Sequence, residues 1–186
     1  LYIIPDRSVL NERERANESL TFRAFQDIAR SGGLEQIILI DLEKVETFLG
    51  DIPLENYDKV LAHNIVNTFA MLNYFDHIEP VKTTKKELPI AVRISTFGLL
   101  NSEDEEFMFY DLDQIKDKEH CYGVTQEEMK KSSLLREVRK KIKSATKDIR
   151  CYYSIYSIES EENQKYIKAY TDICQARNEK IDTPVT

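Results

Sequence analysis

Few residues of this chain have the type and spacing that catalytic or metal chemistry requires. The 186 residues include three cysteines (Cys121, Cys151 and Cys174) with no CxxC pair, and three histidines. His120 and Cys121 are adjacent and could form half of a zinc site, but the sequence offers no second ligand pair to complete it. A position on the surface or in a turn is therefore the simpler interpretation of these two residues. The sequence predicts no metal site and no disulfide framework, and the unpaired cysteines favour a reducing cytoplasm.

The sequence also lacks the short motifs that mark several enzyme classes. It contains no GxGxxG, GxxxxGK[ST], GxSxG or HExxH, so dinucleotide, Walker-type nucleotide, hydrolase-elbow and zincin chemistry have no support. His63 has no acid or nucleophile matched to it. We interpret it as a histidine at the edge of a buried helix face rather than as a catalytic base.

The most informative polar residue is Asn64, which falls inside an apolar stripe. Apolar residues recur in steps of three and four from Tyr57 to Phe75, and this period predicts a long central helix over residues 57–77. An unpaired amide inside such a stripe costs about 1–3 kcal/mol, so Asn64 needs a partner. The pattern leaves two partners open, the neighbouring backbone and a bound ligand.

Two short apolar runs, residues 1–4 and 37–40, predict strands. The first run ends at Pro5-Asp6 and the second at Asp41. Such runs are typical of strands that are buried on both faces of a parallel sheet.

A helix is expected between these two strands. Asn11 followed by Glu14 can form a capping box, and the helical pattern ends at Gly32-Gly33. Its buried stripe is expected to comprise Ala16, Leu20, Ala24, Phe25, Ile28 and Ala29. Strand, helix and strand together make one βαβ crossover.

Charge is distributed along the chain in two opposite blocks. Residues 101–128 carry ten carboxylates and two lysines, a balance of −8, whereas residues 129–150 carry nine basic and two acidic side chains, a balance of +7. Because the blocks nearly cancel, a solvated face is the simpler interpretation of the basic helix 129–150, and a docking surface for a protein partner is the alternative. The net charge of −7 excludes a polycationic nucleic-acid wrapper, so no direct nucleic-acid binding is expected.

The C-terminal half predicts a helix over residues 125–149, a strand over 151–158 and a helix over 161–177. Thr125 and Glu128 form the capping box of the first helix. Its buried face is expected to comprise Leu135, Val138, Ile142, Ala145 and Ile149. Upstream, residues 77–86 indicate a loop, and residues 90–100 fit either a short helix or a strand. Apolar runs stay far below the roughly 20 residues that cross a bilayer, so no membrane span is expected.

Taken in order, these elements resemble the tubulin and FtsZ superfamily, and most of all its plasmid and phage branch, TubZ. Residues 1–7 (LYIIPDR) are similar to the strand and Pro-containing loop near the nucleotide, and residues 37–45 (IILIDLEKV) to the apolar strand that continues into Ile-Asp-Asn and a Lys-Leu pair. Ala62-His63-Asn64 stands where the family carries an Asn that reads the guanine of GTP. The resemblance therefore implies that Asn64 binds GTP.

The same resemblance assigns a catalytic role to the loop after the central helix, which in the family enters the nucleotide pocket of the next subunit. The family pattern there is Asn-x-Asp-x-x-Asp, whereas this chain has Thr84-Lys85-Lys86-Glu87. Glu87 would then be the catalytic acid, with Thr84 in place of the first acid. Leu42 likewise replaces the Asn of Ile-Asp-Asn. These departures predict weak nucleotide affinity and slow or absent turnover.

Two hypotheses from different functional classes follow. By resemblance, residues 1–56 belong to a GTP-binding domain, 57–77 form the central helix, and 78–186 form a smaller α+β second domain. This α/β protein would use GTP and Mg²⁺ and assemble head-to-tail into filaments for plasmid or DNA segregation or cell organisation. The family's phosphate loop would precede residue 1, so this part alone is expected to bind GTP poorly and to be inactive. The alternative is a stand-alone acidic α/β protein-interaction module without nucleotide.

Overall fold

The chain divides into two compact units, which are described separately. The computed structural model describes residues 1–50, 52–85, 92–100, 106–144, 149–159, 161 and 163–165. The first unit comprises Leu1–Ala70 and Glu87–Ile115, and the second comprises Met71–Lys86 and Lys116–Thr186. Both units combine helices with small sheets, so the chain is of mixed α/β class.

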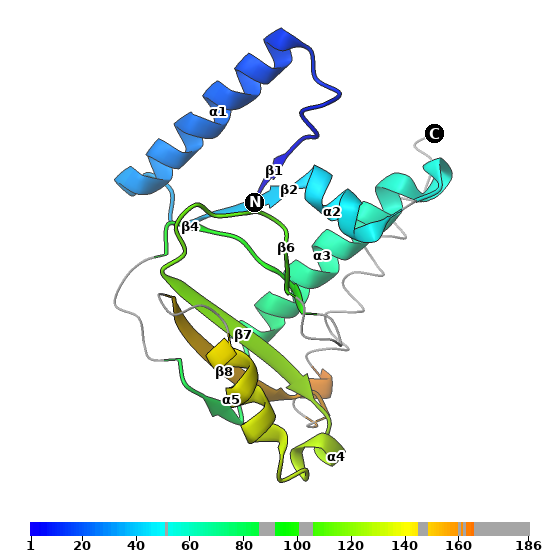
Figure 1. The fold of residues 1–186 in the computed structure, drawn as a ribbon, viewed down its shortest axis with the longest axis vertical. Coiled ribbons are helices and arrows are strands. Elements are labelled where there is room, and N and C mark those ends of the chain that lie inside the picture. Colours follow the sequence, from blue (N-terminus) through cyan, green and yellow to red (C-terminus); the bar gives the residue numbers. More distant parts are fainter. Residues whose placement is uncertain are drawn as a thin grey trace. The chain divides into compact units, whose positions relative to one another are not determined.

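A three-stranded parallel sheet organises the first unit (Figure 1). Its strands are β1 (Tyr2–Ile4), β2 (Ile37–Asp41) and β4 (Ile94–Ser95), in the order β1-β2-β4. Helix α1 (Glu12–Ser31) joins β1 to β2, so the predicted strand-helix-strand order with parallel strands is present. Because β4 pairs with β2, residues around it group with the first unit, whereas the sequence analysis assigns everything from residue 78 onward to a second domain.

The ends of α1 follow the predicted local signals. The Asn11 side chain accepts a hydrogen bond from the Glu14 N–H (3.0 Å), and the Glu14 carboxylate accepts one from the Asn11 N–H (2.9 Å). At the other end Gly32 has a left-handed conformation with a φ of 84°, which residues with a Cβ rarely adopt. The capping box and the glycine stop are both confirmed.

The predicted buried stripe of α1 is wrong for most of its members. Ala29 is fully buried, but Leu20 is 66% exposed, and Phe25 and Ile28 are exposed as well. The helix contacts the sheet mainly through Phe22 and Ala29, which pack in a cluster with Ile37, Leu39, Tyr2, Leu34, Ile94, Tyr110 and Leu112. Helical period alone gave the wrong face, because several apolar residues lie on the solvent side.

The remaining elements of the first unit follow β2 and β4 in the chain. Helix α2 (Leu42–Leu49) is followed by a 3₁₀ turn, η1 (Leu54–Asn56), and by the long helix α3 (Tyr57–Asp76), which the apolar period predicts and which belongs to the first unit as far as Ala70. Strands β5 (Gly98–Leu100) and β6 (Glu106–Met108) form an antiparallel pair, so the segment that was ambiguous in the sequence contains strands.

A second sheet organises the second unit. Its strands are β3 (Lys82–Thr83), β8 (Arg150–Ser157) and β7 (Asp117–Val124), in the order β3-β8-β7. Strands β7 and β8 are parallel and β3 is antiparallel to β8. Helices α4 (Gln126–Met129) and α5 (Leu134–Ser144) connect β7 to β8, and α5 packs on β8 through Val138 (Figure 1).

Three predictions in this part of the chain need correction. The helix expected over 125–149 is broken between α4 and α5, where Arg136 and Glu137 both donate a backbone N–H to the carbonyl of Ser133 at the start of a new helix. Leu134 rather than Leu135 packs on the core. The expected loop 77–86 contains β3.

Other predictions for this part are confirmed or lie outside the described residues. The capping box of Thr125 and Glu128 is present, and β8 matches the strand expected over 151–158. Of the helix expected over 161–177, only residues 161 and 163–165 are described. Within the described ranges, none of the helices is both long and apolar enough to cross a membrane.

Candidate functional site

The candidate site is a polar cavity of about 270 Å³ at the carboxyl ends of β1 and β2. Open α/β sheets bind ligands at this end of their parallel strands, because the loops that follow the strands meet there. The cavity is lined by Ile4, Pro5, Arg7, Phe22, Asp41, Glu43, Lys44, Tyr110 and Asp111. Both loops that the sequence analysis singled out after the predicted strands therefore contribute to one site.

The loop after β1 is held in a tight local turn by Asp6. Its carboxylate accepts hydrogen bonds from the Ser8 N–H (2.7 Å) and the Ser8 hydroxyl (2.8 Å). These two bonds lower the pKa of Asp6, so the carboxylate stays ionised. Asp6 thus shapes the loop, while its neighbours Pro5 and Arg7 face the cavity.

Arg7 is fixed by an ion pair with helix α1. Its Nε and Nη2 both donate to Oε2 of Glu18, at 3.1 and 2.8 Å. The Glu18 side chain is only 7% exposed, and its Oε1 is buried without a hydrogen-bond partner in the described part of the chain. Burial raises the pKa of Tyr2 and Tyr110 nearby, and the Glu18 charge raises both further, whereas Arg7 opposes it. The ion pair therefore ties the β1 loop to α1 beside the cavity.

Asp41 ends β2 and begins α2. Its Oδ1 accepts a hydrogen bond from the Glu43 N–H (3.1 Å), which caps α2, and its own N–H donates to the carbonyl of Phe109 (2.7 Å). Lys44, one turn into α2, forms an ion pair with Asp111. The segment after β6 is thereby held at the carboxyl end of β2.

Tyr110 and Asp111 are site residues that the sequence analysis missed. They belong to the acidic block 101–128, whose charge gave no sign of a fixed position in the fold. The only local signal was the pair of aromatic residues just before them, Phe107 and Phe109. In the structure these two rings pack against each other, and Phe107 stacks on Phe48. The backbone contact that brings them to β2 joins residues far apart in the sequence, so the spacing of residues along the chain does not predict it.

Asn64 lies on α3 and is half-buried. Its Nδ2 donates a hydrogen bond to the backbone carbonyl of Val60 (2.8 Å), so the backbone partner that the sequence left open is present. An amide has a second N–H and an oxygen acceptor, and neither has a partner within the described residues. Asn64 does not line the cavity at β1 and β2.

A hydrogen bond connects the first turn of α3 to α2. The Tyr57 hydroxyl donates a hydrogen bond to the Glu46 carboxylate. This bond raises the pKa of Tyr57 to about 12, with burial and then the charges of Glu46, Asp58 and Asp6 as further causes.

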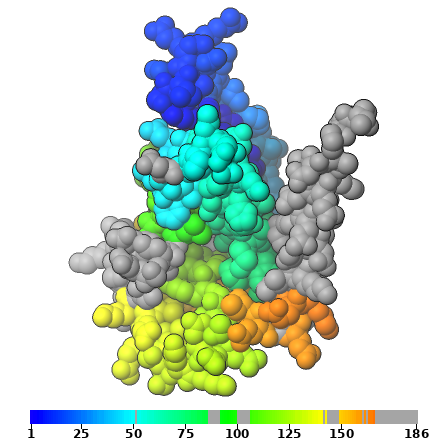
Figure 2. All heavy atoms as spheres, turned by 90° about the vertical axis from the view of Figure 1, so that its right-hand side faces the viewer, coloured from blue at the N-terminus to red at the C-terminus, as the bar shows by residue number. Residues whose placement is uncertain are grey.

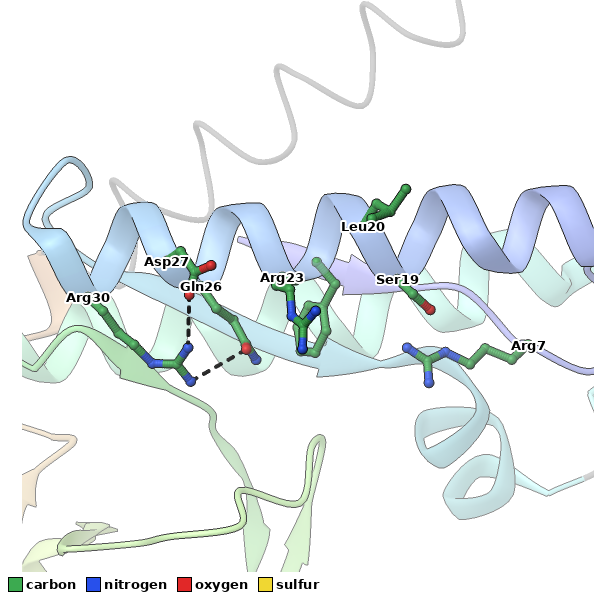
Figure 3. A pocket seen from close by; sticks show the side chains of 8 residues that line it. Arg7, Ser19, Leu20, Arg23, Gln26, Asp27 and Arg30 are labelled. Carbon is green, nitrogen blue, oxygen red and sulfur yellow. Dashed lines mark hydrogen bonds and ion pairs between the residues drawn. The ribbon is translucent and has the colours of Figure 1, made fainter.

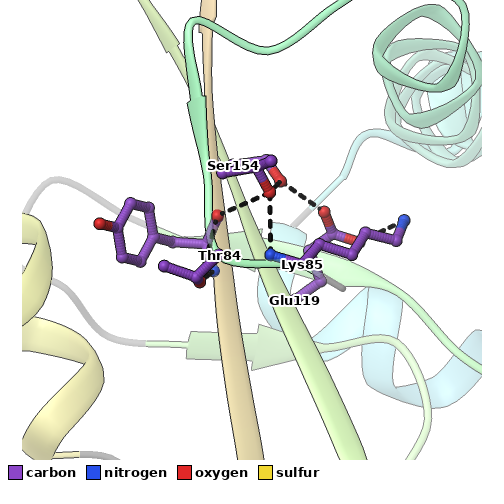
Figure 4. A network of polar contacts seen from close by, with 6 residues as sticks. Thr84, Lys85, Glu119 and Ser154 are labelled. Carbon is purple, nitrogen blue, oxygen red and sulfur yellow. Dashed lines mark hydrogen bonds and ion pairs between the residues drawn. The ribbon is translucent and has the colours of Figure 1, made fainter. Parts of the chain in front are cut away.

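In the second unit, the segment that precedes Glu87 is anchored on β8 (Figure 4). The Thr84 N–H donates to the Tyr153 carbonyl (2.9 Å), and the Tyr153 N–H donates to the Thr84 hydroxyl (3.0 Å). Thr84, which the resemblance places at the first acid position, therefore has a structural bond. Glu87 itself lies outside the described residues.

A buried network extends from this anchor. Ser154, 1% exposed, donates its hydroxyl hydrogen to Oε1 of Glu119 (2.7 Å) and lies 2.8 Å from the Thr83 hydroxyl. Lys85 pairs with Oε2 of Glu119 at 2.8 Å. Because both carboxylate oxygens are engaged, the network locks β3 onto the sheet, and Ser154 is too buried to act as a nucleophile.

The cavity at β1 and β2 is small for a nucleotide. Ligand pockets usually measure about 300–1,000 Å³, and this cavity of about 270 Å³ lies below that range. Arg7 and Lys44 each pair with a carboxylate, and Asp41, Glu43 and Asp111 also line the cavity, so its charged side chains give no net positive charge. In the described part of the chain no group of three or more His, Cys, Asp or Glu side chains could hold a metal ion. Mg²⁺ in phosphoryl-transfer sites is held largely by phosphates and water, so it would depend on the nucleotide.

Comparison with known proteins adds no relative: no family model matches the chain, and no curated protein and no solved structure shows significant similarity to it.

Proposed function

We propose that this chain is part of a tubulin/FtsZ-like, TubZ-type protein that polymerises with GTP into head-to-tail filaments, for plasmid or DNA segregation or cell organisation. The observation that carries the proposal is the shared cavity at the carboxyl ends of the parallel strands β1 and β2. In the resemblance, the loop with Pro5-Asp6 is the one that lies near the nucleotide, and Asp41 ends the strand that matches the family's next apolar strand. The long helix α3 with Asn64 follows them in the same unit up to Ala70.

The exposed edge of the sheet adds support. Strand β1 pairs on one side only within the described residues, and the side chains of Ile3 and of Leu1, just before the strand, are exposed. Parallel sheets normally have covered faces and more than three strands. In a larger nucleotide-binding domain, further strands would pair with this edge and helices packed on the sheet faces would cover these side chains.

In the proposed mechanism, Asn64 recognises guanine through its free N–H and Oδ1, and Glu87 of a neighbouring subunit orients the attacking water. Head-to-tail contacts are heterologous and need not close, so filaments are the expected product. With Thr84 bound to Tyr153 in place of a free acid, we expect slow turnover.

The role of Asn64 can be tested against a matched neighbour. Asn64→Ala in the complete gene product should weaken GTP binding about tenfold or more, because a buried amide contact to the base is lost. Asn67→Ala is the control, since Asn67 is exposed one turn along the same helix. Equilibrium binding of a fluorescent GTP analogue measures both variants, and equal affinities would contradict the assigned role.

A stand-alone acidic interaction module is the second candidate, and the hydrogen bond of Asn64 to Val60 favours it. Under this alternative Asn64→Ala lowers the free energy of unfolding by up to about 1 kcal/mol and changes no ligand binding. Chemical denaturation of the same variants measures that effect, so one set of proteins separates the two functions.

A further inference from the structure

A second, larger groove runs along helix α1 and shares only Arg7 and Phe22 with the cavity at the ends of β1 and β2. It has a volume of about 540 Å³ and is lined by Arg7, Ser19, Leu20, Phe22, Arg23, Gln26, Asp27 and Arg30. Its helical members recur at steps of three and four, which places them on one face of α1. Figure 3 shows Arg7, Arg23 and Arg30 spaced along that side of the helix.

The three arginines give this groove a positive lining. Arg30 pairs with Asp27 at 3.3 Å, at an exposed position where such a pair is weak. Arg7 pairs with Glu18. Arg23 is exposed and has no ion-pair or hydrogen-bond partner in the described part of the chain. With three arginines and one aspartate, the groove is positive on a chain whose net charge is −7.

The chain itself contains a segment whose negative charge is opposite to that of the groove. Residues 103–106 read Glu-Asp-Glu-Glu, the longest run of consecutive carboxylates in the sequence. Guanidinium groups bind carboxylates through paired, charge-assisted hydrogen bonds, and an open groove with several arginines suits an extended acidic segment better than a small enclosed ligand.

We propose that the α1 groove binds the acidic segment 103–106 of a second copy of this chain. The groove and the segment are different parts of the chain, so the contact is heterologous and each copy can add another. This inference rests on the self-association in the proposed function and names one contact through which it occurs. The contact requires no nucleotide, so it can be measured separately from GTP-dependent assembly.

Charge reversal on the two surfaces tests the contact. Arg23→Glu leaves a defective groove and an intact acidic segment, whereas the double variant Asp104→Lys, Glu105→Lys has the opposite defect. Analytical ultracentrifugation without nucleotide at low salt should show concentration-dependent oligomers for the unmodified chain and a loss of association of about tenfold or more for each variant alone.

The mixture of the two variants gives the decisive result. One intact groove and one intact segment remain, so the equimolar mixture should form a 1:1 complex and stop there. Arg13→Glu, an equal charge change at an exposed position of α1 outside the groove, is the control and should assemble like the unmodified chain.

Each other outcome overturns the inference in a recognisable way. A monomeric unmodified chain, unaffected variants, or a mixture that does not recombine would exclude this contact. If these results accompany intact GTP-dependent pelleting, the filament uses another surface and the proposed function stands. If the predicted 1:1 complex forms while GTP has no effect on the complete gene product, the contact stands and the nucleotide function fails.

Discussion

At the residue scale, Asp41 both stabilises the fold and lines the candidate site. Its side chain caps α2, its backbone N–H binds the Phe109 carbonyl, and it lines the cavity at the ends of β1 and β2. A residue with three such contacts fixes where α2 begins, and with it the position of Lys44 beside Asp111.

Removing this cap should therefore have a measurable cost. Asp41→Ala should lower the free energy of unfolding by about 1 kcal/mol, because the Glu43 N–H loses its partner at the helix N-terminus. Asp41→Asn should retain most of the stability, since an asparagine also caps. Urea denaturation followed by circular dichroism measures both; a loss as large for Asn as for Ala would show that capping is not the cause.

Cys121 is a partly buried thiol whose surroundings disfavour reaction. It packs with Tyr74, Phe75 and Tyr156 in the second unit. Burial and then the Glu119 charge raise the pKa of its thiol to about 12, while Lys85 opposes the shift. The thiolate, which is the nucleophile, is therefore strongly disfavoured at neutral pH.

This environment predicts slow alkylation. In a variant whose other two cysteines are serine, Cys121 should react with iodoacetamide at least a hundredfold more slowly than free cysteine at pH 8, because both thiolate fraction and access are low. In denaturant, Cys121 should react with iodoacetamide at the rate of free cysteine. Fast labelling of the folded chain would contradict the burial of this side chain.

At the scale of elements, a network of polar side chains holds strand β3 in its sheet, rather than a long series of backbone hydrogen bonds. With only two residues it has few backbone bonds of its own, and Thr83, Thr84 and Lys85 attach it to the sheet through Ser154, Tyr153 and Glu119. The hydroxyl of Ser154 lies at the centre of this arrangement.

Ser154→Ala should lower the free energy of unfolding by about 1–3 kcal/mol, because Glu119 Oε1 and the Thr83 hydroxyl lose a partner at a buried position. Ser132→Ala, at an exposed position of the same unit, serves as the control and should change it by less than about 0.5 kcal/mol. Denaturation midpoints with unchanged slopes measure both effects, and a neutral Ser154→Ala would show that the network does not hold β3.

How much of these elements the sequence could predict depends on how local their causes are. The capping boxes at Asn11 and Thr125, the stop at Gly32 and the period of α3 act within a few residues, and all were predicted. Strand β7 was missed, because its mixed polar sequence becomes a strand only by pairing along its whole length with β8. The exposed face of α1 was misassigned for a similar reason, since only the sheet decides which side of a helix is covered.

The same limit applies to the candidate site. Pro5-Asp6 and Asp41 could be placed from the ends of apolar runs, because strand ends carry local signals. Tyr110 and Asp111 reach the cavity through the return of the chain after β6, which no local pattern records.

At the scale of the whole molecule, the chain comprises two units, and each contains a sheet. The first contains the cavity at the strand ends and, on α1, an exposed surface visible as the blue atoms in Figure 2. The second contains the anchored segment that leads toward Glu87. If the first unit receives a nucleotide and a neighbour supplies Glu87, then assembly and hydrolysis are coupled, and both must depend on GTP.

Sedimentation of the complete gene product with GTP, GDP or a non-hydrolysable GTP analogue, with phosphate release followed in parallel, tests this coupling most directly. The account predicts pelleting above a critical concentration with GTP and with the analogue but not with GDP, and slow phosphate release that Glu87→Gln reduces further without preventing assembly. Pelleting that is independent of nucleotide, or no pelleting together with no GTP binding, would contradict the central claim.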